Sequence, residues 1–359
     1  NKMKKIILIS LIALTVASCN QKNSNTETQS NYLRPTKADT VDATNDFYDN
    51  AETYELAVKP ISIEGEIENP GLVDFSTLPL RSVIVKETLL AENGDEFIGA
   101  YRYDGYSLYD MLNHIKLNKK NSDEFNPIID LYVQVENDKG EKVNISWGEV
   151  YYPNHLQEII VAKRVMRIVP SKTNELWPLP ESGKLVIASD LITERNISNP
   201  VKITVKSYPK SFKTVKGLKP LYSPSLDIYN ENEKLVSLTK NPHELSKETF
   251  HTIFYGRGRG IHSTQPFEGV MLKDILSRYI EFNRESIRQG IFLVVAEDGY
   301  RGVFTFSEVM NRNDQSEILL VCNPEVKDDG IFRLFPACDF FSDRAIKGIN
   351  AIYFSANEQ

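Results

Sequence analysis

The sequence predicts an α+β fold made of two tandem, related domains. One pattern occurs twice, at Asp104–Leu112 and at Glu268–Leu276, and each copy reads acid, Gly, two variable residues, Leu, one variable residue, Asp, one variable residue, Leu. Strand-like alternation flanks each copy, and no regular β-α-β alternation appears. These observations favour two diverged copies of one domain, each with mixed or antiparallel sheets and a few helices.

Length and charge limit the classes of function. The 359 residues suffice for two domains of ordinary size, each with its own core. A hydrophobic share of 41%, with 25% charged residues, is typical of a globular protein. The net charge of −7 lacks the concentrated basic surface of nucleic-acid-binding proteins, so no nucleic-acid partner is expected.

The N-terminus has the pattern of an export signal. Lys2, Lys4 and Lys5 precede an apolar run, 6–16, which is too short for a comfortable membrane span. The run ends in Val-Ala-Ser-Cys19, which resembles a bacterial lipobox, so we expect a signal peptide over 1–19 and lipidation of Cys19. The alternative is an ordinary secretory signal that contains a Cys.

Residues 20–54 are rich in Asn, Thr, Ser and acidic residues and poor in apolar ones. Such a segment buries too little surface to offset its ordering entropy, which predicts a flexible tether. Together with the lipidated Cys19, it predicts a protein tethered through its lipid to a membrane of the bacterial cell envelope, outside the cytoplasm. The sequence leaves the membrane leaflet and the oligomeric state open.

Each copy of the repeated pattern predicts the start of a helix. In the first copy, apolar residues recur at helical spacing from Leu108 to Ile115, and Ser107 is placed to cap the helix. In the second copy, the same spacing runs from Leu272 to Ile280. Alternating apolar residues predict strands before and after each helix, with turns at 137–140 and 297–299.

The segments that follow the helices also correspond. Ser146 to Val150 aligns with Thr305 to Val309, and Arg195 and Arg344 each precede a final strand by the same distance. The predicted domains are therefore 55–207 and 208–359, with the boundary between 207 and 213.

Several of these residues resemble a known family. Ile63–Gly71 with Tyr103–Leu112, and more loosely Phe267–Leu272 with Ala296–Tyr300, are similar to the oxidoreductase molybdopterin-binding domain of the sulfite oxidase type. The resemblance implies that fold in both copies and a molybdopterin cofactor whose metal is also held by one protein thiolate.

In that family the thiolate comes from the strand and loop ahead of the Gly-led helix. The matching regions here, 83–102 and 250–266, contain no Cys. The metal's electronics would change with a harder ligand, so the sequence departs from the family at the residue on which redox activity depends. Catalytic residues are not assigned, and the cofactor is left open.

The most unusual stretch is the Gly- and Arg-rich segment His251–His262. Alternating glycines free backbone N–H groups, and arginines offer planar forks for phosphate or carboxylate. The alternative is a solvated loop whose arginines serve solubility. The candidate binding residues for an anionic or pterin-like ligand are Tyr255, Arg257, Gly258, Arg259, Gly260, His262 and Arg301.

No metal site is predicted. His251 and His262 could share an ion with Glu268, but histidines in a Gly-rich loop more often hydrogen-bond locally. Cys322 and Cys338 form no C-x-x-C motif, and either a disulfide or two free thiols fits the sequence.

Three functions remain. The first is binding of a small anionic or pterin-like ligand without redox turnover. The second is a molybdopterin-dependent oxidoreductase of the sulfite oxidase type, as the resemblance implies. The third is a protein-interaction module of the envelope.

Overall fold

The computed structural model describes residues 51–356 apart from 171, 326–327 and 329. The predicted signal peptide, Cys19 and all but the last residues of the predicted tether lie outside these residues. Within them, no helix is long and apolar enough to cross a membrane.

The structure is mostly β, with 43% strand and 12% helix, so the predicted α+β fold of the sulfite oxidase type is wrong. Four small sheets are arranged like a four-bladed β-propeller. Their strand orders nevertheless differ from the up-and-down meander of a propeller blade, because each sheet pairs strands distant in sequence.

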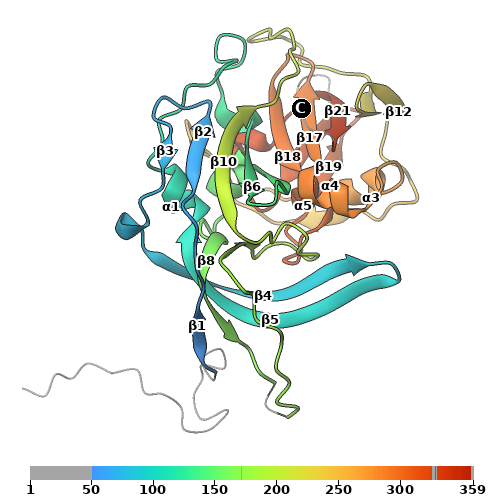
Figure 1. The fold of residues 1–359 in the computed structure, drawn as a ribbon. Coiled ribbons are helices and arrows are strands. Elements are labelled where there is room, and N and C mark those ends of the chain that lie inside the picture. Colours follow the sequence, from blue (N-terminus) through green and yellow to red (C-terminus); the bar gives the residue numbers. More distant parts are fainter. Residues whose placement is uncertain (1–50, 171, 326–327, 329, 357–359) are drawn as a thin grey trace, which may run out of the picture. The chain divides into compact units, whose positions relative to one another are not determined.

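The first half of the chain forms two sheets (Figure 1). One has the order β1-β8-β5-β4, with β9 also on β8, and the other has the order β3-β2-β10-β6-β7. The strands are β1 (Thr53–Glu55), β2 (Ser62–Gly65), β3 (Gly71–Leu72), β4 (Leu80–Ala91), β5 (Gly94–Ser107), β6 (Leu131–Asn137), β7 (Lys142–Ser146), β8 (Ile159–Arg167), β9 (Lys184–Ile187) and β10 (Pro200–Ser207).

The second half repeats this strand order. The order β12-β11-β21-β17-β18 matches β3-β2-β10-β6-β7 position by position, and β13-β16-β19-β20 matches β4-β5-β8-β9. In both halves the closing strand pairs in parallel with the opening one, β10 with β2 and β21 with β11. The strands are β11 (Leu226–Asn230), β12 (Glu233–Leu238), β13 (Glu248–Phe250), β14 (Phe254–Gly256), β15 (Gly260–Ser263), β16 (Phe267–Met271), β17 (Ile291–Ala296), β18 (Arg301–Thr305), β19 (Ile318–Cys322), β20 (Phe332–Pro336) and β21 (Ile349–Ser355).

The helices are short, and they make up 12% of the structure. The predicted start at Ser107 is confirmed, because its side chain accepts a hydrogen bond from the Asp110 N–H. The helix ends at Leu112, however, so Ile115 lies beyond it. The helices are α1 (Leu108–Leu112), α2 (Trp147–Tyr151), α3 (Leu272–Leu276), α4 (Arg284–Gln289) and α5 (Phe306–Met310), with 3₁₀ turns η1 (Phe75–Thr77), η2 (Ile128–Asp130) and η3 (Ser342–Arg344).

Each half has a hydrophobic core of its own, and a smaller core joins them. Ile63, Val133 and Ile203 belong to the first-half core. The second-half core is formed mainly by residues beyond 225. The shared core contains Tyr132 from the first half, Tyr208 directly after β10, and Ile291, Leu293, Val295 and Val303 from the second half.

A buried ion cluster also joins the halves. Arg195 Nη2 lies 2.6 Å from Glu149 Oε1 and 2.6 Å from Asp190 Oδ1. In the second half the equivalent Arg344 contacts Glu308 and Asp339, each at 2.7 Å. No side chain of the cluster is more than 5% exposed. Both arginines are the residues that the sequence places at matching distances from the closing strands.

The residues that cap α2 and α5 each form a hydrogen bond to a carboxylate in the other half of the chain. Ser146 caps α2, and its Oγ also donates to Glu308 Oε2 at 2.5 Å. Thr305 caps α5, and its Oγ1 donates to Glu149 Oε2 at 2.8 Å. Each hydroxyl therefore serves its own helix and the carboxylate of the other half.

Candidate functional site

The Gly- and Arg-rich segment folds as a β-hairpin. β14 and β15 pair with Phe254 opposite Ser263 and Gly256 opposite Gly260. Arg257, Gly258 and Arg259 therefore form the tip of the hairpin.

The three glycines of the hairpin differ in whether their position leaves room for a side chain. A Cβ on Gly256 would lie 2.3 Å from His262 Nε2, so the imidazole rests against a backbone that has no side chain. Gly260 has a φ of +74°, which favours glycine. A Cβ on Gly258 would meet open space. The backbone of Gly260 therefore favours glycine, whereas a side chain at Gly256 would displace the His262 imidazole.

The hairpin is held against the segment around η3. Arg257 Nη2 and Nε donate to Asp343 Oδ1 at 2.8 and 3.0 Å. This hydrogen bond raises the pKa of the Arg257 guanidinium, which stays charged. Tyr255 packs on Phe340 and Phe341, with ring centroids 5.6 and 6.3 Å away.

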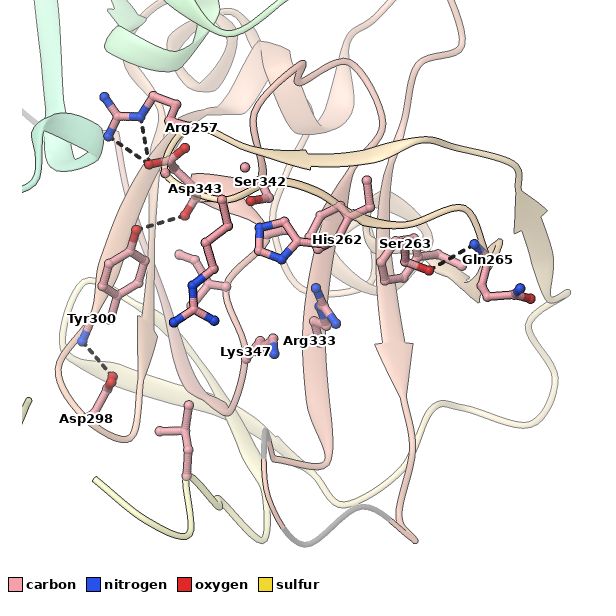
Figure 2. Close-up of a pocket in the computed structure, with 18 of the residues that line it drawn as sticks. Arg257, His262, Ser263, Gln265, Asp298, Tyr300, Arg333, Ser342, Asp343 and Lys347 are labelled. Atoms are coloured by element: carbon pink, nitrogen blue, oxygen red, sulfur yellow. Dashed lines mark hydrogen bonds and ion pairs between the residues drawn. The ribbon is translucent and has the colours of Figure 1, made fainter. Parts of the chain in front are cut away.

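A cavity of about 740 Å³ opens beside the hairpin (Figure 2). Its lining includes four basic side chains, Arg257, Arg259, Arg333 and Lys347, against two acidic ones, Asp298 and Asp343. Figure 2 shows His262, Arg333 and Lys347 around the same space. We call this space the basic cavity, because its lining carries a net positive charge.

Aromatic rings support one wall of the basic cavity. The Arg333 guanidinium lies 4.9 Å from the ring centroids of both Phe254 and Phe267. Phe267 stacks on Phe335 with centroids 4.3 Å apart. Cation–π contacts of this kind fix the plane of a guanidinium beside a binding space.

Arg259 differs from the other basic residues. It is exposed, and it makes no hydrogen bond or ion pair with any residue that the structure describes. Its guanidinium retains all its donors for a ligand.

The structure brings four of the seven predicted site residues to the cavity lining: Arg257, Gly258, Arg259 and His262. Tyr255 and Gly260 shape the hairpin without lining the cavity.

Arg301 lies elsewhere. It is fully buried, and its Nη2 donates to Glu124 Oε1 at 2.8 Å. Its Nε lies 3.7 Å from Asp130, and its guanidinium is 4.5 Å from the Phe125 centroid. These contacts give Arg301 a structural place between the halves rather than a place in the basic cavity.

Sequence reasoning missed Arg333, Lys347 and Asp343. They lie beyond residue 330 and reach the hairpin only through the fold, and no local motif marks them. One signal was available: the predicted turn 297–299 contains Asp298, and both Asp298 and the adjacent Tyr300 line the cavity.

Metal and redox features do not mark this site. Among the residues that the structure describes, no group of three or more His, Cys, Asp or Glu side chains could hold a metal ion. Cys322 and Cys338 are free thiols.

These features define a β-rich protein with a basic cavity beside a Gly- and Arg-rich hairpin. No family model and no curated protein sequence matches the chain.

Proposed function

We propose that the protein binds a small anion, a phosphate or carboxylate compound, in the basic cavity. The observation that carries this proposal is the composition of the lining, which contains four basic side chains and two acidic ones. A cavity of about 740 Å³ lies in the size range of small-molecule sites.

The geometry explains how each charge would act. Arg257 is fixed by Asp343, and Arg333 lies over two aromatic rings, so both present a preset orientation. Arg259 is exposed at the hairpin tip and can close on a ligand from the open side. Preset donors lower the entropy lost on binding.

We further propose that binding takes place at the bacterial envelope, with the protein tethered by a lipid on Cys19. The support for this location is the N-terminal sequence: a basic segment, an apolar run and the Val-Ala-Ser-Cys ending. Because the fold class differs from that of the sulfite oxidase type, the proposal does not extend to molybdenum chemistry.

Calorimetric titration with inorganic phosphate, pyrophosphate and citrate tests the binding proposal. We expect at least one of these anions to bind, and the double variant Arg259→Gln with Lys347→Gln to weaken that binding by about tenfold or more. Two lost charge-assisted hydrogen bonds account for an effect of this size.

The matched control is Lys59→Gln with Arg164→Gln, which removes two positive charges from the first half. Lys59 is exposed and Arg164 is partly exposed, and both pair with acids outside the basic cavity. If the control weakens binding as much as the cavity variant, binding reflects overall charge and the site is wrong.

A further inference from the structure

A second cavity shares Arg257 with the basic cavity. It measures about 360 Å³ and is otherwise mostly apolar. Its lining comprises Leu112, Asn113, Ile115, Leu117, Ile128, Trp147, Tyr151, Tyr152, Arg257 and Phe341. We call it the aromatic cavity.

Aromatic rings form much of this cavity. Trp147 and Tyr151 stack with centroids 4.9 Å apart and planes inclined by 28°. Phe341 meets Tyr152 edge to face at 6.1 Å. An apolar cavity with a few placed polar groups is the usual form of a site for an organic ring.

One polar group in the lining has no partner. Tyr152 is 2% exposed, and its hydroxyl makes no hydrogen bond with any described residue. An unpaired buried hydroxyl costs free energy that a ligand acceptor would recover.

The Tyr152 side chain packs in a small cluster that also contains Tyr300 and Phe341. Burial raises the pKa of Tyr152 to about 12, and the charges of Asp343 and Arg257 follow as the next largest influences. Both residues line the basic cavity. Tyr300 lines the basic cavity and Phe341 lines the aromatic one, so Tyr152 lies close to the linings of both.

We propose that the two cavities form one site for an aryl-linked anion, with the ring in the aromatic cavity and the acid group in the basic cavity. The oxygen that joins ring and acid group accepts a hydrogen bond from the Tyr152 hydroxyl. The placement of the acid group rests on the proposed anion-binding function, whereas the ring site stands on its own observations.

Both halves of the chain contribute to this site. α1 and α2 of the first half provide the apolar wall, and the β14–β15 hairpin of the second half provides Arg257. A ligand that spans both cavities would therefore contact both copies of the repeated unit.

Calorimetric titration with three probes separates the ring from the anion: inorganic phosphate, 1-naphthol and 1-naphthyl phosphate. We expect 1-naphthol to bind, and 1-naphthyl phosphate to bind at least about tenfold more tightly than phosphate, because ring burial adds affinity. Tyr152→Phe should weaken 1-naphthol binding by about five- to tenfold. The same variant should leave the unfolding midpoint unchanged or raised, because the hydroxyl has no partner in the protein.

Two further variants complete the experiment. Asn113→Trp places a large side chain at an exposed position of the aromatic cavity, and should abolish 1-naphthol binding while leaving phosphate binding unchanged. Tyr279→Phe removes a hydroxyl outside both cavities and should change nothing.

The outcomes distinguish the two proposals. If 1-naphthol binds but no anion does, the anion-binding function fails and the ring site stands. If the ring adds no affinity, or if Tyr152→Phe binds 1-naphthol as well as the parent protein does, the aryl-linked site is overturned.

Discussion

At the scale of single residues, the hairpin glycines have different roles. A Cβ on Gly256 would collide with His262, whereas one on Gly258 would meet open space. We expect Gly256→Ala to displace the His262 imidazole and to weaken anion binding severalfold. The shift of the imidazole signals in NMR spectra measures the displacement.

Gly258→Ala is the matched control for this prediction. It adds the same methyl group two residues away, where a Cβ would meet no other atom, and should leave the imidazole signals unchanged. Equal effects from the two substitutions would show that His262 does not depend on Gly256.

A second prediction for a single residue concerns the pKa of Glu308. Burial raises its pKa to about 7, partly offset by Arg344, and the charge of Glu149 adds to the rise. Burial also acts on Glu149, but the charge and hydrogen bonds of Arg195 outweigh it and lower that pKa. Burial and the charge of Glu149 therefore favour the protonated form of Glu308, and Arg344 opposes it.

The sign of the pH effect follows from linkage. Between pH 4.5, the usual pKa of a Glu carboxyl, and about pH 7, native Glu308 binds a proton that the unfolded chain does not. Stability from this group is therefore fully present below 4.5 and is lost as pH rises through 7. We expect a loss on the order of 1–3 kcal/mol between pH 5 and pH 8.

Urea denaturation across this pH range measures the effect. Glu308→Gln imitates the protonated form and should flatten the profile, while Glu248→Gln on exposed β13 should leave it as in the parent protein. A profile that keeps its full slope in Glu308→Gln would assign the proton to another group.

At the scale of secondary-structure elements, the caps of α2 and α5 link the two halves. Ser146 Oγ accepts from the Glu149 N–H and donates to Glu308, and Thr305 Oγ1 accepts from the Glu308 N–H and donates to Glu149. Ser146→Ala and Thr305→Val should each cost about 1–3 kcal/mol of unfolding free energy. Because they share partners, their combined effect should depart from additivity by about 0.5 kcal/mol or more.

Ser107→Ala provides the comparison within the same experiment. Ser107 caps α1 and bonds only to Asp110 among the side-chain contacts described. Combined with Thr305→Val, it should give additive losses. Additivity in both pairs would show that the caps do not couple the halves.

The elements also show what the sequence can predict. The cap at Ser107 and the face made by Leu108, Met111 and Leu112 are local features, and both are present. The long pairing of β4 with β5 turns at Glu92–Asn93, where the Asn93-Gly94 dipeptide is a local hairpin signal that the prediction did not use. The periodicity beyond Leu112 suggested a longer helix, but α1 ends there. The fold class is wrong because strands dominate the structure and form four small sheets.

The candidate site likewise contains some residues that the sequence marks locally and others that only the fold brings together. Gly256 to His262 stand out in the sequence because their composition is unusual. Arg333, Lys347 and Tyr152 come from distant segments, and only tertiary pairing brings them to the two cavities. Arg301 carries the same charge as the cavity arginines, and only its burial shows its structural place.

At the scale of the whole described chain, the two halves should unfold as one cooperative unit. The ion cluster and the shared core of Tyr132, Tyr208 and four residues of β17 and β18 lose their contacts together when either half opens. Scanning calorimetry should show a single transition with equal calorimetric and van 't Hoff enthalpies. Two resolved transitions would contradict this coupling.

Mass spectrometry of the protein, purified under native conditions from its own host, tests directly whether the basic cavity binds an anion. We expect a small phosphate or carboxylate compound to accompany the parent protein and to be lost from the variant with Arg259→Gln and Lys347→Gln. Equal occupancy in the two proteins, or a bound molecule without an acid group, would contradict the assignment of the basic cavity as an anion site.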